Sequence, residues 1–434
     1  MLSRRQFLIS SASCFAMPAL TMAESIQTLR AEEVEVELFE DTSPTRLWGF
    51  NGSTPGPVLR VAQGDSVRVR FVNGLDQPSA IHWHGLRIDN PMDGVPDLTQ
   101  DAVMPGDSFD YEFIAPDAGT YWFHSHHRSW EQVARGLYGA LIVDEGDPPE
   151  IDHDIVVYID DWRLNRDGSQ VEDFENLHDQ AHAGRLGNVA RVIFADAPGV
   201  LRRGERIRLR LINAATDRIF PLVINGVEGK TVALDGMPVD QPRPLGELTL
   251  APAQREDVIA DVKGDEVSLD FLSRNGPYRL GELKVAPGNG RAARKEMGAL
   301  PPNPYRVPDL ARAIPLTLRM EGGAMSPRLS NGAVWAFNGQ STLAEVPFHS
   351  FARGETGRIN IENRTRFPHG IHLHGHHFEI LDDGVPAERR DTVLVDALES
   401  REIACVFDNP GKWLLHCHML GHQASGMKTW IQVG

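Results

Sequence analysis

Metal-binding side chains gather near the C-terminus of this 434-residue chain. The segment HCHMLGHQASGM contains His416, Cys417 and His418, followed by His422 and Met427. Two imidazoles, a thiolate and a weak axial thioether are the ligand set of a blue-copper electron-transfer centre. Because His422 and Met427 follow Cys417 so closely, one loop can carry three of these four ligands. The segment therefore predicts a copper site that transfers single electrons.

Three more histidine clusters lie upstream, and one of them can supply the missing imidazole. The clusters are His82-Trp83-His84, His124-Ser125-His126 and the segment HGIHLH, which holds His369, His372 and His374. Successive side chains of a strand point to opposite faces, so histidines at i and i+2 share a face. Such a pair can converge on one metal or on neighbouring metals. His369 is the candidate for the fourth ligand of the thiolate site.

The same alternation applies to His416, Cys417 and His418. It sends the thiolate to one face and both imidazoles to the other, so the metal at Cys417 is a few covalent bonds from metals at its neighbours. The other histidines are interpreted as ordinary core or surface residues: His127, His153, His178, His182, His349, His376 and His377.

Composition favours an all-β protein of two to four domains. The chain has 40 Gly, 29 Pro and many short aliphatic runs, and it lacks long stretches of 3.6-residue periodicity. Its formal charge of −17 argues against a nucleic-acid partner or an anionic membrane surface.

The first 23 residues predict an export signal. A twin-arginine pattern, Ser3-Arg4-Arg5-Gln6-Phe7-Leu8, precedes a short apolar stretch that ends in small residues near Ala23. We expect cleavage there and a periplasmic location in a Gram-negative host, with no membrane attachment afterwards. An uncleaved helical anchor is the alternative.

The three cysteines leave no disulfide framework. Cys14 lies in the expected signal, and Cys417 is the candidate thiolate ligand. Cys405 then has no partner, and its surroundings (EIACVF) predict a buried strand in which it acts as a small hydrophobic residue.

The chain contains an internal repeat. HWHG at 82–85 aligns with HLHG at 372–375 at an offset of 290, and GTYWFHSH at 119–126 aligns with GKWLLHCH at 411–418 at an offset of 292. Ser125 replaces Cys417, so the first copy keeps imidazoles only. A third copy, at an offset of 140, has Leu222 and Ile224 in place of the histidines. The sequence thus predicts metal sites shared between the first and last copies, with the middle copy as a ligand-free scaffold.

Alternating segments such as 66–72 and 206–211, separated by turn residues, are typical of Greek-key β-sandwiches. We expect three consecutive domains at 24–146, 150–286 and 304–434. The segments between them, 144–151 and 286–304, are rich in Pro, Gly and charged residues.

The motifs HWHG, HSH, HGIHLHG and HCHxxxHxxxxM, in this order on three cupredoxin-like repeats, resemble the multicopper oxidases, which include laccases and bacterial copper-tolerance oxidases. The resemblance covers nearly all of the expected mature chain and implies four coppers. It implies a type 1 site at His369, Cys417, His422 and Met427, and a type 2 site at His82 and His372. The implied type 3 ligands are His84, His124 and His418 for one copper, and His126, His374 and His416 for the other.

The resemblance also implies a reaction. A small reducing substrate loses single electrons at type 1 copper, and dioxygen becomes water at the other three. Asp93 falls where the family places a carboxylate that supplies protons, although an Asp-Gly turn explains it equally well. Gln423 follows His422 where some bacterial relatives carry Glu, so proton delivery follows another route here. An axial Met427 favours a low to medium potential.

The substrate remains open between two classes. A phenol or aromatic amine is favoured, because the Met-rich insert of cuprous oxidases is reduced here to Met297, Met320 and Met325 in residues 291–331. Oxidation of Cu(I) for copper tolerance, or of Mn(II), is the alternative. A copper nitrite reductase and a copper-free structural periplasmic protein are alternatives of other classes. A monomer is expected, since one chain carries both halves of the cluster.

Overall fold

The computed structural model describes residues 26–38, 44–288, 294, 296–324, 326, 329 and 333–434. The expected signal at 1–23, with Cys14, lies outside these residues, as does Met325. Within them, strands predominate and the helices are short: α1 (Ser129–Gln132), α2 (Leu177–Ala181), α3 (Leu420–Ala424) and the 3₁₀ turn η1 (Asn90–Met92). No helix of the described part is long and apolar enough to cross a membrane.

The first β-sandwich has two four-stranded sheets. One has the order β2 (Thr45–Phe50), β1 (Gln27–Val36), β4 (Ser66–Asn73) and β6 (Ser108–Ile114). The facing sheet has the order β3 (Leu59–Ala62), β8 (Tyr138–Asp144), β7 (Gly119–Ser125) and β5 (Ile81–His84).

The second sandwich has sheets of six and five strands. The first has the order β10 (Val189–Ala195), β9 (His153–Trp162), β12 (Arg206–Asn213), β17 (Arg255–Val262), β14 (Val227–Leu234) and β15 (Met237–Pro244). The other has β11 (Leu201–Arg202), β19 (Gly276–Ala286), β18 (Glu266–Ser273), β13 (Phe220–Asn225) and β16 (Leu248–Leu250).

The third sandwich also has six and five strands. Its larger sheet has the order β21 (Trp335–Phe337), β20 (Ile314–Gly322), β23 (Glu355–Asn363), β28 (Ser400–Phe407), β25 (Phe378–Asp382) and β26 (Val385–Arg390). The smaller has β22 (His349–Phe351), β30 (Lys428–Val433), β29 (Gly411–Cys417), β24 (His369–Leu373) and β27 (Thr392–Val395). The expected all-β fold of three consecutive cupredoxin-like sandwiches is confirmed.

Strand register reproduces the internal repeat. His82 pairs with His124 where β5 meets β7, and His372 pairs with His416 where β24 meets β29. In the middle sandwich Leu222 and Ile224 lie on β13 and enter an apolar core instead. The candidate metal-binding histidines therefore occur on equivalent strands of the first and third sandwiches.

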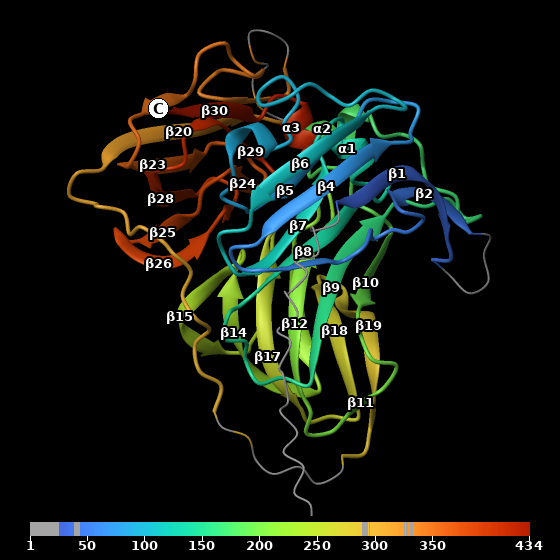
Figure 1. Cartoon of the computed structure of the whole chain (residues 1–434). Coiled ribbons are helices and arrows are strands. Elements are labelled where there is room, and N and C mark those ends of the chain that lie inside the picture. Colours follow the sequence, from blue (N-terminus) through green and yellow to red (C-terminus); the bar gives the residue numbers. More distant parts are fainter. Residues whose placement is uncertain are drawn as a thin grey trace, which may run out of the picture.

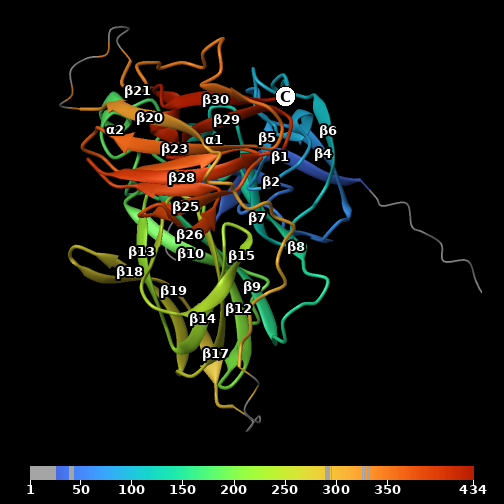
Figure 2. The same cartoon turned by 90° about the vertical axis from the view of Figure 1, so that its left-hand side faces the viewer.

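The three sandwiches are arranged so that the first and third meet above the second. In both Figure 1 and Figure 2, the blue-to-teal first domain and the orange-to-red third domain lie side by side, and the green-to-yellow middle domain packs below both. Strand β17 of the middle domain contacts β7 of the first, and β14 and β15 contact β26 of the third.

Burial of the alternating segments differs between domains. In β4, Val67, Val69 and Phe71 are buried, as expected for a half-exposed sheet. In β12 the arginines that alternate with the apolar residues are buried too. Arg208 and Arg210 pair with carboxylates, and Arg208 reaches the first domain at Glu145 (2.7 Å). This face is buried because the first domain packs on it, and the charges are compensated there.

Candidate metal centres

Eight histidines line the contact between the first and third domains. Each domain supplies them from the end of a strand or from the residues directly after it, and all eight are buried. Strands β5 and β7 supply His82, His84, His124 and His126, and strands β24 and β29 supply His372, His374, His416 and His418.

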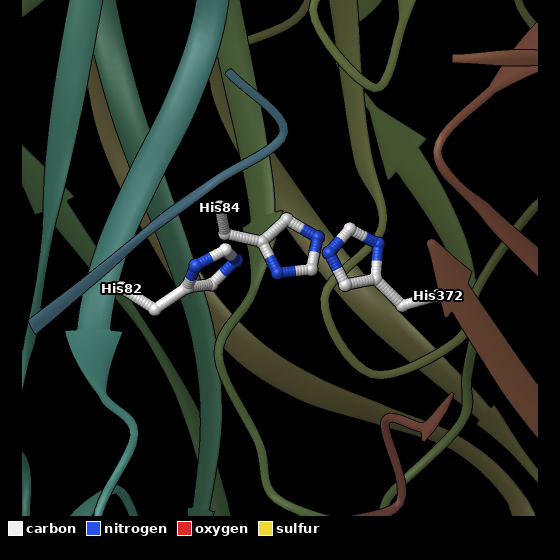
Figure 3. Close-up of side chains that lie close together, drawn as sticks. All are labelled: His82, His84 and His372. Carbon is white, nitrogen blue, oxygen red and sulfur yellow. The ribbon is translucent and has the colours of Figure 1, made fainter. Parts of the chain in front are cut away.

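Ring nitrogens of these side chains form three close groups, in each of which they lie within 4.8 Å of one another. Every group draws on both domains. Figure 3 shows one of them, in which the rings of His84 and His372 face each other, with centroids 3.7 Å apart. The groups are His82, His84 and His372; His84, His124 and His418; and His126, His374 and His416.

Most of these imidazoles are oriented by a hydrogen bond from their outer nitrogen. Nδ1–H of His82 donates to the Asp93 carbonyl (2.7 Å), and Nδ1–H of His372 donates to the Asp391 carbonyl (2.9 Å). His124 and His416 donate in the same way to the carbonyl of the residue that follows each. Such bonds fix the tautomer and leave the other nitrogen as the inward-facing lone pair.

The inward nitrogens have no adequate partners among the described residues. His374 Nε2 lies 3.0 Å from His416 Nε2, although two neutral lone pairs repel each other. Four further inward nitrogens make no hydrogen bond at all: His82 Nε2, His84 Nδ1, His126 Nε2 and His372 Nε2. His124 Nε2 and His418 Nε2 likewise face each other, 3.4 Å apart. Buried polar atoms are normally satisfied, so this donor set fits metal ions bound between the domains.

Burial also keeps these ligands in the form that binds metals. Loss of hydration lowers the pKa of seven of the eight imidazoles, and for most of them neighbouring histidines lower it further: His84, His124, His126, His372, His374, His416 and His418. Neutral imidazole is the ligating species.

A second kind of centre surrounds Cys417. Its Sγ lies 3.6 Å from His369 Nδ1 and 3.9 Å from His422 Nδ1, and these two nitrogens are 3.0 Å apart. Such separations suit one ion with ligand bonds of about 2.0–2.3 Å. Burial raises the pKa of the Cys417 thiol, so a metal must displace its proton.

The outer nitrogens at this centre are also held. His369 Nε2 is hydrogen-bonded to the Thr365 hydroxyl (2.8 Å), and His422 Nε2–H donates to the His182 carbonyl (2.8 Å). As the alternation in HCH predicts, Cys417 faces this centre while its two neighbours face the histidine groups.

Met427 closes the loop that carries Cys417 and His422. It is fully buried in the same apolar cluster as Cys417, whose N–H donates to the Met427 carbonyl (3.0 Å). Its own N–H donates to the carbonyl of His422 (3.0 Å). The loop therefore holds Met427 beside the centre, and its role as an axial ligand stays a prediction.

Asp93 has both features that the sequence suggested: it lies in a turn, and its carboxylate lies beside the histidines. It follows the 3₁₀ turn η1 and precedes Gly94, which has a φ of 80°. Its buried carboxylate also accepts a hydrogen bond from His374 Nδ1 (2.9 Å) and lies 3.3 Å from His82 Nδ1. Asp93 thus touches one histidine of each domain, and its role in proton supply stays a prediction.

Sequence reasoning missed Asp391 and Arg255. The Asp391 carboxylate lies 3.3 Å from His84 Nε2 and binds both terminal nitrogens of Arg255 (3.0 and 2.7 Å). Burial alone would raise the pKa of Asp391, but Arg255 and His84 hold it well below its usual range. No motif marks either residue, because the contacts join all three domains across more than a hundred residues.

The middle domain also contributes to the surroundings of the histidines. None of the candidate ligands lies in its described residues, and its strand β17 supplies Arg255, which binds Asp391. Cys405, by contrast, is a fully buried free thiol of β28, as the sequence predicts.

These features define a class: a three-domain cupredoxin-like protein with a Cys-His metal centre beside a histidine-rich cluster. Three sequence models, each described as multicopper oxidase, match residues 32–148, 164–289 and 310–434. The chain therefore belongs to the multicopper oxidase family.

Two known proteins of this kind are similar over most of the chain, and a third is similar over about half of it. The structure of Lac15 from a marine microbial metagenome is 50% identical, covers 94% of this chain and 100% of its own, and superposes with a TM-score of 0.82. Multicopper oxidase MmcO of Mycobacterium tuberculosis is 29% identical over 93% of this chain and 86% of its own. Copper resistance protein A of Pseudomonas syringae is 34% identical over 49% of this chain and 42% of its own.

The contact of Asp391 with His84 predicts a selective loss of copper. Replacing Asp391 by Asn removes the charge that orients the imidazole, and changes of this kind typically weaken metal binding by about 10–100-fold. We expect Asp391→Asn to lose cluster copper at lower chelator concentration than the wild type while the visible absorption of the Cys417 centre persists. The exposed Asp396→Asn serves as the control. Equal chelator resistance of the three proteins would contradict this role.

The buried, neutral histidines predict that the copper-free protein is labile in acid. Burial lowers the pKa of His376 and of His377 to about 4. The unfolded chain binds more protons between pH 6.5 and 4, so stability present above pH 6.5 is lost as the pH falls toward 4, by about 3 kcal/mol per group. Urea unfolding of copper-free protein at several pH values measures this loss. His376→Gln should flatten the dependence and His349→Gln should not; identical slopes would refute the prediction.

Proposed function

We propose that the protein oxidises a small reducing substrate in single-electron steps and reduces dioxygen to water, using four coppers. One observation carries the proposal: Cys417 faces two imidazoles of the thiolate centre, while its neighbours His416 and His418 each join a different three-histidine group. The two kinds of site are therefore linked by a few covalent bonds.

The residues are assigned by the groups that they form. Type 1 copper would be held by His369, Cys417 and His422, with Met427 as a fourth ligand, and type 2 copper would be held by His82 and His372. The type 3 coppers take His84, His124 and His418, and His126, His374 and His416, which agrees with the close groups of ring nitrogens. When bound, copper supplies the one-electron chemistry that these side chains lack.

The protein's own groups orient the ligands and move protons. Asp93 and Asp391 accept hydrogen bonds from outer imidazole nitrogens and so hold the rings toward the metals. We assign proton supply to the Asp93 carboxylate, which is buried between the domains and whose Oδ2 lies 2.9 Å from His374 Nδ1. Gln423 is buried beside His422 but has no acidic proton to give.

A phenol or aromatic amine is the favoured substrate. Met320 is buried in the core of the third domain, so it provides no sulfur for a soluble ion, and Met297 packs on a separate apolar cluster. The alternative, oxidation of Cu(I), is supported by the partial similarity to copper resistance protein A. Mn(II) is a further candidate donor.

The proposed location is the periplasm, reached through the twin-arginine signal expected at residues 1–23, and the proposed state is a monomer. Both halves of the cluster come from one chain, so no second copy is needed to complete it. A two-copper nitrite reductase and a copper-free structural protein are the competing classes, and copper content separates them.

Removal of the thiolate tests the proposal. The wild type should bind about four coppers per chain and consume dioxygen with an aromatic amine. Cys417→Ser should bind about three, lack the type 1 visible absorption and lose donor oxidation, because the first electron acceptor is gone. Cys405→Ser, which alters the other buried thiol, should match the wild type. Full activity of Cys417→Ser, or a wild type with about two coppers or none, would overturn the assignment.

Donor preference is a separate prediction. Initial rates of oxygen uptake with a phenol, an aromatic amine, Cu(I) and Mn(II) give kcat/KM for each. We expect an aromatic donor to have the highest value, because the described residues provide no exposed cluster of methionines. A higher value for Cu(I) would favour the copper-tolerance alternative.

A further inference from the structure

The hairpin between β14 and β15 places a two-residue turn at the junction of the three domains. Its residues, Asp235 and Gly236, have φ values of 47° and 83°, as a tight Asp-Gly hairpin turn requires. A Cβ on Gly236 would lie 2.5 Å from the Tyr121 ring of the first domain. The Asp235 carbonyl accepts a hydrogen bond from His377 Nε2–H of the third domain (2.9 Å). The turn is therefore held by both other domains.

The buried carboxylate of Asp235 accepts hydrogen bonds at both of its oxygens. Oδ1 accepts from the backbone N–H of Arg255 (2.8 Å) and from the Arg390 guanidinium (3.4 Å). Oδ2 accepts from the backbone N–H groups of Asp391 and Thr392 of the third domain (both 3.3 Å). Asp235 thus grips two successive peptide groups of another domain, and the two nearby guanidinium groups compensate its charge.

A second residue of the middle domain holds the same segment. The Gln254 side chain donates through Nε2 to the Thr392 carbonyl (2.8 Å), while its Oε1 accepts from the Ala251 N–H (2.8 Å). The N–H of Thr392 is held by Asp235 and its carbonyl by Gln254, and both side chains are buried. The middle domain therefore fixes the backbone of segment 391–392.

The segment held in this way orients two candidate copper ligands. The Asp391 carbonyl accepts from His372 Nδ1–H (2.9 Å), and the Thr392 hydroxyl lies 3.2 Å from the same nitrogen. The Asp391 carboxylate lies 3.3 Å from His84 Nε2 and accepts from the Thr392 hydroxyl (2.8 Å). His84 and His372 are the rings that face each other in Figure 3. Movement of segment 391–392 would therefore turn both rings away from their present directions.

We propose that Asp235 and Gln254 are positioning residues of the middle domain, which set the geometry of the copper at His82 and His372 by holding segment 391–392. Each acts through the backbone of that segment and not through a bond to a ligand. The inference rests on the proposed function, which assigns the type 2 copper to this pair of histidines.

Asp235→Asn weakens the grip with almost no change of shape. Each carboxylate oxygen accepts from two N–H donors. Whichever way the amide of Asn is turned, its NH₂ group therefore faces two donors that it cannot bind. The matched control is Asp240→Asn, because Asp240 is an exposed residue of the same hairpin.

Gln254→Met tests the second contact without changing a charge, and it also decides the matter should Asp235→Asn fail to fold. It keeps the length of the side chain and removes the hydrogen bond to the Thr392 carbonyl. Gln170→Met is its control. Gln170 is also a buried glutamine of the middle domain, and its Nε2 donates to the Ala134 carbonyl of the first domain (2.7 Å).

Electron paramagnetic resonance of the copper-loaded proteins gives the readout. We expect both test variants to show an altered type 2 hyperfine splitting, with the type 1 absorption unchanged. They should also lose type 2 copper at a chelator concentration about tenfold lower than the wild type, the lower end of the effect of removing a direct partner of a ligand. Both controls should match the wild type. A test variant with the wild-type signal and chelator resistance, whatever its thermal stability, would show that its residue is only structural.

Transient kinetics locate the defect. Without dioxygen, an aromatic amine should reduce the type 1 centre of the test variants within about twofold of the wild-type rate, because that centre is untouched. Turnover with dioxygen should fall at least about tenfold. A wild type without any type 2 signal would refute the proposed function and this inference with it. A normal wild-type signal that both test variants reproduce would refute this inference alone.

Discussion

The structure depends on buried imidazole nitrogens of two domains that face one another without hydrogen-bond partners. These nitrogens are buried, so each unpaired lone pair carries a desolvation cost, and shared metal ions would remove it. The surrounding groups serve the same arrangement, because Asp93 and Asp391 hold outer nitrogens and leave the inner ones free. Metal binding and the association of the two domains are therefore energetically coupled.

The middle domain takes part in this arrangement although it holds none of the candidate ligands. Its Arg255 compensates the buried charge of Asp391, and its helix α2 covers the thiolate centre. Its arginines on β12 pair with buried carboxylates, including Glu145 of the first domain. Breaking such a buried pair typically costs about 3–5 kcal/mol, so the relative position of the domains is well specified. Leu222 and Ile224, which stand where the other two copies carry histidines, pack in the apolar core of this domain.

The sequence predicted the features that arise from local spacing. Histidines at i and i+2 fall at the ends of strands β5, β7, β24 and β29 or directly after them, and the duplication places them at equivalent positions. The all-β fold and the buried, unpaired Cys405 followed from composition and alternation. The buried face of β12 did not, because alternation shows only that one face differs from the other. What covers each face depends on the partner domain.

Contacts between residues far apart in the sequence could not be predicted either. Asp391 contacts His84 across 307 positions, and His182 meets His422 across 240. Neither contact leaves a periodic or compositional signal, since each involves one ordinary residue at a loop or helix end. The role of Asp93 could not be decided from sequence, because the same residue is suited both to an Asp-Gly turn and to proton supply.

The most direct test of the shared cluster is anomalous diffraction at the copper edge from crystals of copper-loaded protein. The account predicts three copper peaks between the strand ends of β5 and β7 and those of β24 and β29, with a fourth at Cys417. Peaks confined to a single domain, or an interface whose histidines pair with each other and bind no copper, would contradict it.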